Sequence, residues 1–177
     1  MNFCQHRAPR GFTLIEVMIA LLVTATGLLG VAKIQAASIA NTKISGSRAL
    51  IALQTGSLVS AMHANPAYWA SGTAPLQWTV SKASPLSDPV LGINVSAFAP
   101  CNSGCTPEQL AALDVQEWAS SMAVQFPTYK AKVNCSNTKP INCTVFVQWD
   151  EKSIAINKAT VNAKQQTSET FSVHLQP

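Results

Sequence analysis

The sequence predicts an α+β fold, in which a long N-terminal helix packs against a C-terminal antiparallel sheet. Three observations lead to this prediction. An apolar, helix-forming stretch runs from Phe12 to Ala64, a second and well-capped helix begins near Pro107, and the last fifty residues contain segments in which apolar and polar residues alternate. The alternating segments suit an antiparallel sheet with one wetter face.

The first helix is expected to end at Ala64, because the residue before Pro66 is pushed out of the α-helical region. Apolar residues in its second half fall on two nearly opposite sides. One side contains Ile44, Ile51, Leu58, Val59 and Met62, and the other contains Ile39, Leu50 and Leu53. A helix with two apolar faces has two surfaces to pack against, although a helix buried in the core of a single domain gives the same pattern.

The start of this helix is apolar and long enough to cross a membrane. Residues 12–32 span about 30 Å at 1.5 Å per residue, the thickness of the hydrocarbon core. Arg7 and Arg10 precede this segment and are expected to hold the N-terminus on the cytoplasmic side, so that the rest of the chain faces outward. Glu16 is out of place in an ordinary anchor, since a carboxylate costs roughly 2.5–3.5 kcal/mol at the bilayer centre. We therefore expect Glu16 to have a partner.

The remaining elements are predicted from capping and alternation. Thr106 is a suitable N-cap, Pro107 suits the first helical position and Gln109 completes a capping box, so a helix is expected from Pro107 to about Ala123. Its expected inward stripe is Ala111, Val115, Trp118 and Met122. The expected strands are Leu76–Val80, Val90–Val95, Tyr129–Val133, Val145–Trp149 and Phe171–Leu175, with a long exposed loop from Glu151 to Glu169.

The segment from Arg10 to Val17 resembles the cleavage and methylation motif of type IV prepilins and type II secretion pseudopilins. The resemblance implies that a membrane peptidase cuts between Gly11 and Phe12 and methylates the new N-terminal Phe12. The leader would be residues 1–11, and the mature chain would keep 166 of the 177 residues, that is 177 − 11. The new α-amino group would be a buried charge in a filament of packed helices, and Glu16 would supply its counter-charge. A conventional secretory signal, cut after its apolar region near Ala37, is the alternative, but Glu16 interrupts the apolar core that such a signal needs.

Further landmarks are similar to the minor pilin family known as type IV pilus modification protein PilV. They are Gly27-Leu28-Leu29-Gly30-Val31-Ala32, Ile34-Gln35-Ala36, Met62-His63-Ala64-Asn65-Pro66, the stretch from Cys105 to Asp114 that leads to Trp118, and Cys143-Thr144-Val145-Phe146-Val147-Gln148-Trp149-Asp150. Two departures are the length of residues 151–169 and the histidine at position 63, where the family has a basic residue such as arginine.

This resemblance implies the type IV pilin-like fold and a non-catalytic minor pilin that helps to prime pilus assembly. The implied partners are the prepilin peptidase, other minor and major pilins, and the inner-membrane assembly machinery, with no cofactor. The domains would be the leader, a transmembrane segment at 12–32, the periplasmic half of the helix at 33–65 and a globular periplasmic domain at 66–177. The protein would be a single-pass inner-membrane protein that is incorporated into a cell-surface pilus.

The cysteines fit an exported domain. Cys4 falls in the leader, and four cysteines remain, for which three pairings are possible. We favour Cys101–Cys105 and Cys135–Cys143, the second because its two residues flank a turn-rich stretch between strands. The alternative is a zinc site with four thiolate ligands, but the longer of the two cysteine spacings fits the usual zinc ligand spacing poorly.

Composition and motifs argue against several other functions. The mature chain has 10 Lys and Arg against 8 Asp and Glu, once Arg7 and Arg10 are removed from the 12, and a charge of +2 is too weak to indicate nucleic-acid binding. His6, His63 and His174 have no nucleophile-like motif or phosphate-binding loop near them, so no enzyme and no metal site are expected. Two alternatives remain: a minor pseudopilin of a type II secretion system, and a periplasmic enzyme or binding domain on an uncleaved anchor.

Overall fold

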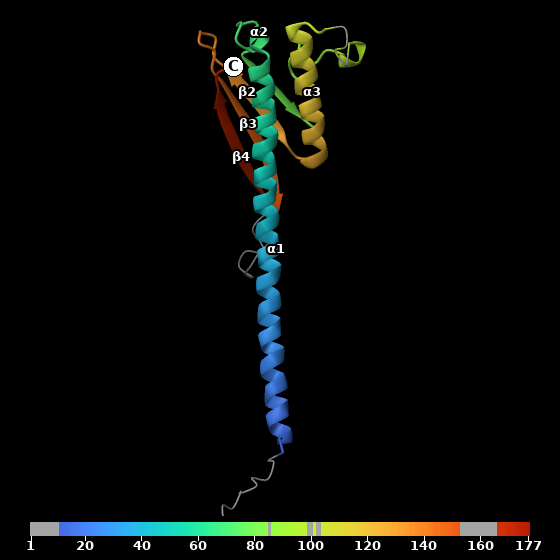
Figure 1. Ribbon diagram of the computed structural model, residues 1–177, viewed down its shortest axis with the longest axis vertical. Helices are drawn as coiled ribbons and strands as arrows, with labels where there is room; N and C mark the ends of the chain where they lie inside the picture. The colour runs from blue at the N-terminus through green and yellow to red at the C-terminus, as the bar shows by residue number, and fades with distance from the viewer. Residues whose placement is uncertain (1–10, 85, 99–100, 102–103, 153–165) are drawn as a thin grey trace, which may run out of the picture. The chain divides into compact units, whose positions relative to one another are not determined.

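The structure is a computed structural model that describes residues 11–84, 86–98, 101, 104–152 and 166–177 (Figure 1). Contacts between residues divide the chain into two compact units, Met1–Thr42 and Lys43–Pro177, called here the N-terminal unit and the C-terminal unit. Most of the expected leader, with Cys4, His6, Arg7 and Arg10, lies outside the described residues.

The long helix α1 spans Leu14–Ala64 and supplies the described helix of the N-terminal unit as well as the first helix of the C-terminal unit. It begins two residues after the predicted start and ends where Asn65-Pro66 predicts. Pro66 then occupies the first turn of a short helix α2, Pro66–Trp69, a position where its missing N–H leaves no hydrogen bond unmade. The Asn65 side chain donates to the carbonyl of Pro107 at 2.7 Å, which ties the end of α1 to the start of the next long helix.

The C-terminal unit contains a four-stranded antiparallel sheet with the strand order β1-β2-β3-β4. The strands are β1 (Gln77–Ser81), β2 (Lys130–Cys135), β3 (Cys143–Lys152) and β4 (Gln166–Leu175). A 3-10 helix η1 (Val95–Ala97) and the helix α3 (Pro107–Gln125) lie between β1 and β2 in the chain. The predicted α+β fold, with a long N-terminal helix packed against an antiparallel sheet, is confirmed.

The core of the C-terminal unit lies between one face of the sheet and the two helices α1 and α3. Helix α1 buries Ile51, Thr55, Leu58 and Met62, a spacing of three to four residues that places them on one face. Three of these belong to the predicted apolar side that contains Ile44, whereas Leu50 and Leu53 on the other predicted side are exposed. The sheet contributes Trp78, Val80, Ala131, Val133, Val145, Val147 and Trp149.

Helix α3 follows its prediction closely. Thr106 Oγ1 accepts a hydrogen bond from the backbone of Gln109, and the Gln109 side chain accepts one from the backbone of Thr106, which completes the capping box. The predicted inward residues Ala111, Val115, Trp118 and Met122 are all buried. Trp118 also donates its indole N–H to the carbonyl of Gln54 at 2.7 Å, so that α3 and α1 are joined by a hydrogen bond as well as by packing.

The predicted strand Val90–Val95 is wrong. Asp88 Oδ1 accepts hydrogen bonds from the backbone N–H groups of Val90 and Leu91, each at 2.9 Å, and the Asp88 carbonyl accepts another from Gly92. Asn94 then caps η1 by accepting from the N–H of Ser96. Short polar side chains have taken the backbone donors that a sheet would need, and the alternation of apolar residues did not reveal this competition.

The predicted exposed loop from Glu151 to Glu169 is also wrong at both ends. Strand β3 extends to Lys152 and β4 begins at Gln166, with Glu151 opposite Thr167 and Trp149 opposite Glu169. Residues 153–165 of that loop lie outside the described residues.

Candidate processing and assembly site

The junction predicted for cleavage is an exposed, non-helical peptide just before α1. Gly11, Phe12 and Thr13 are exposed and precede the first helical residue, and the Phe12 side chain is 83% exposed. A protease needs such an accessible backbone segment. A Cβ added to Gly11 would meet nothing within 4 Å, so the fold itself does not require glycine at this position. A requirement for glycine here would therefore come from a partner that binds the junction.

Glu16 lies in the first turn of α1. Its backbone N–H is bonded to the carbonyl of Thr13 at 3.1 Å and approaches Thr13 Oγ1 at 3.4 Å, so Thr13 serves as the N-cap of α1. A carboxylate in the first turn interacts favourably with the positive end of the helix dipole. Within the described ranges the Glu16 carboxylate has no salt-bridge partner.

The first half of α1 is apolar and entirely exposed. Every residue from Leu14 to Ala36 is exposed, and an 18-residue window of this helix has a mean hydropathy of 2.2 with no buried residue. It is the described helix whose length and composition suit a membrane crossing. The hydroxyls of Thr24 and Thr26 donate back to carbonyls three and four residues earlier, so neither hydroxyl is left without a partner in an apolar surrounding.

In the C-terminal unit, an ion pair fastens α1 to the sheet. Arg48 on α1 donates from Nε and Nη2 to the Glu151 carboxylate on β3 at 2.9–3.3 Å, in the fork geometry that arginine makes with carboxylates. Trp149 donates its indole N–H to the same carboxylate at 3.0 Å, and Glu169 Oε1 lies 3.5 Å from Arg48 Nη2.

Glu151 is only 8% exposed, and its surroundings hold its charge. The hydrogen bond from Arg48, helped by the one from Trp149, lowers the pKa of Glu151 below its usual value of 4.5, against the opposing effect of burial. The same pairing raises the pKa of Arg48. Sequence reasoning missed this cluster, because Glu151 was assigned to an exposed loop. The available signal was the continued alternation from Val145 through Val147 and Trp149 to Glu151, which places Glu151 on the inward face.

Both disulfides among the described residues join the pairs favoured from the sequence. Cys135 and Cys143 are directly opposite each other in the pairing of β2 with β3, with an S–S distance of 2.03 Å. Cys101 and Cys105 are bridged across a short turn just before α3. Cysteines in disulfides do not provide thiolate ligands, so the structure gives no support to the zinc alternative.

The two described histidines are far apart in the chain and differ in setting. His63 is exposed near the end of α1, and His174 Nδ1 lies 2.8 Å from Thr144 Oγ1 across the pairing of β3 with β4. In the part of the chain that the structure describes, no three His, Cys, Asp or Glu residues are grouped so that they could hold a metal ion.

Comparison with known families identifies one motif. Residues 6–32 match the family model described as the prokaryotic N-terminal methylation motif, which covers the cleavage junction, Glu16 and the apolar segment. Comparison with curated proteins and with solved structures gave no match. The motif supports a type IV pilin-like prepilin, either a pilin or a pseudopilin, and it implies processing by prepilin peptidase and assembly with other pilins. Together with the apolar helix, it fits a pilin anchored in the inner membrane.

Proposed function

We propose that this protein is a minor type IV pilin, a structural subunit that helps to prime pilus assembly and is a substrate of prepilin peptidase. The observation that carries the proposal is the methylation motif at residues 6–32, placed on an exposed junction and followed at once by a long apolar helix. The minor role, and the likeness to the pilus modification protein PilV, rest on the resemblance of the sequence landmarks.

In this proposal, residues 1–11 are the leader and residues 12–32 cross the inner membrane. Residues 33–65 form the periplasmic half of the long helix, and residues 66–177 form the periplasmic globular domain. The accessibility of Gly11 and Phe12 supports the proposal, since the peptidase must bind this peptide before it cuts and methylates. The two disulfides suit an oxidising compartment such as the periplasm.

Glu16 has the role of charge pairing during assembly. Cleavage creates a positive α-amino group on Phe12, four residues before Glu16, in a segment that packs among apolar helices. A buried charge is tolerated only with a partner, and the Glu16 carboxylate has no salt bridge within the described residues. A neighbouring subunit's Phe12, or its own, supplies that partner.

The outward side of α1 in the C-terminal unit faces neighbouring pilins in this proposal. Leu50 and Leu53 are 47% and 71% exposed, on the side of α1 opposite the buried Ile51 and Leu58. Exposed leucines along one side of a helix are typical of a surface that another helix covers. Other minor and major pilins, together with the inner-membrane assembly machinery, are the proposed partners.

The decisive experiment is mass spectrometry of the N-terminal peptide of the membrane-extracted protein. We expect N-methyl-Phe12 as the first residue, and we expect that replacement of Gly11 by a bulky residue such as leucine leaves a full-length precursor in the membrane. A replacement of Gly30 by leucine is the matched control, because Gly30 is also surrounded by open space but lies away from the junction. An intact leader in the wild-type protein, or a start near Ala37, would contradict the proposal and favour an uncleaved anchor or an ordinary secretory signal.

Deletion separates the pilus from the type II secretion system, whose minor pseudopilins share the motif. Loss of pili and of twitching motility supports the pilin. Loss of exoprotein secretion with intact pili would assign the subunit to the secretion system instead.

A further inference from the structure

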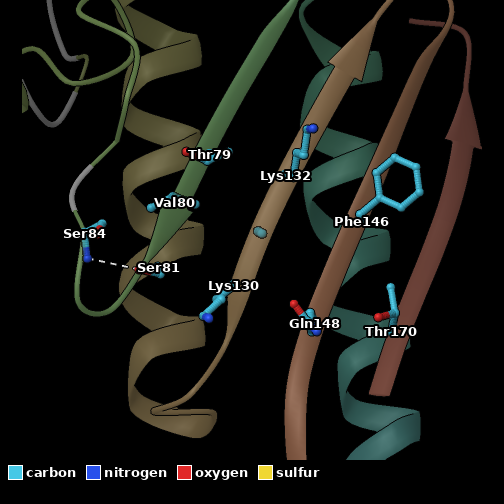
Figure 2. A pocket seen from close by; sticks show the side chains of 10 residues that line it. Thr79, Val80, Ser81, Ser84, Lys130, Lys132, Phe146, Gln148 and Thr170 are labelled. Carbon is cyan, nitrogen blue, oxygen red and sulfur yellow. Dashed lines mark hydrogen bonds between the residues drawn. The ribbon is translucent and has the colours of Figure 1, made fainter. Parts of the chain in front are cut away.

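The sheet has an outer face that the helices do not cover. Figure 2 shows this face, with α1 and α3 behind the sheet and side chains such as Lys132, Phe146 and Thr170 on its outer side. A groove of about 420 Å³ runs over this face. The lining residues that the argument uses are Ser81, Lys130, Lys132, Phe146, Gln148 and Thr170.

The strand register arranges the polar groups of this face in two neighbouring rows. Lys130 lies between Ser81 on β1 and Gln148 on β3, and Thr170 on β4 continues that row. In the next row, Lys132 lies between Thr79 and Phe146. Because adjacent strands are about 4.8 Å apart and alternate residues of a strand about 6.6 Å apart, each lysine has hydroxyl or amide groups or an aromatic ring as its nearest neighbours.

Lys130 and Lys132 place two positive charges on this face, and Asp150, two residues beyond Gln148 on β3, places a carboxylate on the same face. The salt bridges of Arg48 lie on the opposite face of the sheet. Phe146 is the large apolar side chain of this face and is only partly buried, beside Lys132 in the pairing of β2 with β3. The groove therefore offers two cations, one aromatic surface and a surrounding of hydroxyl and amide groups.

This combination favours an acidic oligosaccharide over a macromolecular partner. A protein interface would need an apolar centre, and Phe146 is the large apolar side chain of this face. Binding of nucleic acid draws its affinity from the neutralisation of several phosphates and from stacking of several bases, and two lysines with one phenylalanine offer little of either. The volume of the groove lies in the range of small-ligand sites, which is the size of a short oligosaccharide.

We propose that this groove binds carboxylate-bearing oligosaccharides. Lys130 and Lys132 bind the sugar carboxylates by charge-assisted hydrogen bonds. Ser81, Gln148 and Thr170 exchange hydrogen bonds with sugar hydroxyls, and Phe146 packs against the apolar face of a sugar ring. The proposal is independent of whether the subunit belongs to a pilus or to a secretion system.

The test is calorimetric titration of the full-length protein, purified in a detergent without sugar groups, with trigalacturonate and with 3′-sialyllactose. Maltotriose, an uncharged trisaccharide, is the control ligand for the contribution of the carboxylates. We expect at least one acidic sugar to bind, with an affinity that falls as salt increases, and maltotriose to bind at least tenfold more weakly. Binding of neither acidic sugar, or equal binding of maltotriose, would overturn the proposal whatever the variants do.

Variants then locate the site. The double change Lys130→Gln and Lys132→Gln should weaken binding of the acidic sugar about tenfold or more, as expected when charge-assisted hydrogen bonds are lost. The double change Lys33→Gln and Lys43→Gln removes the same charge from exposed positions of α1 and should leave binding unchanged. Replacement of Lys130 and Lys132 by arginine should keep most of the affinity, which separates loss of charge from loss of fold.

Two further results would overturn the proposal. The first is equal weakening by both double glutamine variants, which would reduce the effect to overall charge. The second is tighter binding of a 20-base-pair DNA duplex than of either sugar, abolished by the Lys130 and Lys132 changes, which would assign the face to nucleic acid.

Discussion

Two stretches of the same helix differ in what surrounds them. From Leu14 to Ala36 every side chain of α1 is exposed, whereas from Ile51 to Met62 one side of the helix is buried at intervals of three or four residues. The second stretch is held by packing against the sheet and α3, which is how most protein helices are stabilised. The first stretch has no such packing in the described chain, so its apolar side chains need an environment outside this subunit.

One glutamate in each unit shows the same difference in whether its partners lie within the described chain. Glu151 in the C-terminal unit is buried and is bonded to Arg48 and Trp149. Glu16 in the N-terminal unit has no salt bridge within the described residues. The C-terminal unit therefore pairs its buried charge within its own fold, whereas the charged and apolar groups of the N-terminal unit are suited to partners from outside this subunit.

The strongest test of this comparison is the change Glu16→Ala. In a complex of packed helices it would leave the α-amino group of Phe12 without its partner, and an uncompensated buried charge costs on the order of 3–5 kcal/mol. We expect a processed and inserted subunit that no longer co-purifies with other pilins, and a Glu16→Gln variant that fails in the same way. Unfolding of the C-terminal unit should not change. Wild-type incorporation of either variant into filaments would remove the charge-pairing role.

The second test compares two neighbouring positions of α1 in the C-terminal unit. Ile51 is fully buried and Leu53 is 71% exposed. We expect Ile51→Ala to lower the free energy of unfolding by about 2–5 kcal/mol, because it leaves a cavity in the core. Leu53→Ala should change it by less than about 0.5 kcal/mol. All four tryptophans lie in the C-terminal unit, at 69, 78, 118 and 149, so tryptophan fluorescence during urea unfolding of the full chain reports on this unit.

A larger loss in the free energy of unfolding for Leu53→Ala than for Ile51→Ala would show that α1 is stabilised mainly by contacts of its outward face. In an assay of co-purification with other pilins, Leu53→Ala should have the larger effect of the two, provided that the proposed filament contact is correct.

Sequence reasoning predicted the helices and the antiparallel sheet because these depend on local and periodic signals. The capping box of α3, the stop at Asn65-Pro66 and the alternation of β2 can each be read within a few residues. The methylation motif could also be identified from the sequence, because its residues are contiguous in the chain.

The features that could not be predicted depend on contacts between residues distant in the chain, or on side chains that compete for the hydrogen bonds of the backbone. Arg48 and Glu151 are 103 positions apart, and nothing local to either residue identifies its partner. Asp88 converts an apolar run into a turn through two hydrogen bonds of its side chain, although the apolar pattern around Val90 suggested a strand. The groove of the outer sheet face arises from the register of four strands, and register was not available from the sequence.

A third test removes the bridge between Cys135 and Cys143. Replacement of both by serine should lower the free energy of unfolding of the C-terminal unit by about 2–3 kcal/mol, because the unfolded chain regains the entropy of the short loop that the bridge closes. Urea unfolding followed by tryptophan fluorescence measures this loss, and non-reducing peptide mapping of the wild type identifies the pairing. Cleavage of the junction at Gly11 should continue unchanged, since the bridge lies in the other unit. Free thiols at both cysteines in the wild type would contradict the prediction.

The smallest effect is expected at the ion pair of Arg48, because this side chain is 53% exposed and solvent weakens its interaction. Arg48→Met should lower the stability of the C-terminal unit at pH 7, where Glu151 is charged and would lose its main partner. The pKa of Glu151 is lowered in the folded chain, so the ion pair contributes stability above the usual value of 4.5, and this contribution is lost as the pH falls through the lower, folded value. The difference between wild type and variant in the urea midpoint should therefore be largest at neutral pH and should shrink toward pH 3.

The control is Lys43→Met, which removes one charge at an exposed position of the same helix. This variant should show neither the loss of stability nor its pH dependence. If the urea midpoints of the Arg48 variant and the wild type differed by the same amount at pH 7 and pH 3, the salt bridge between Arg48 and Glu151 would not be the source of the lost stability.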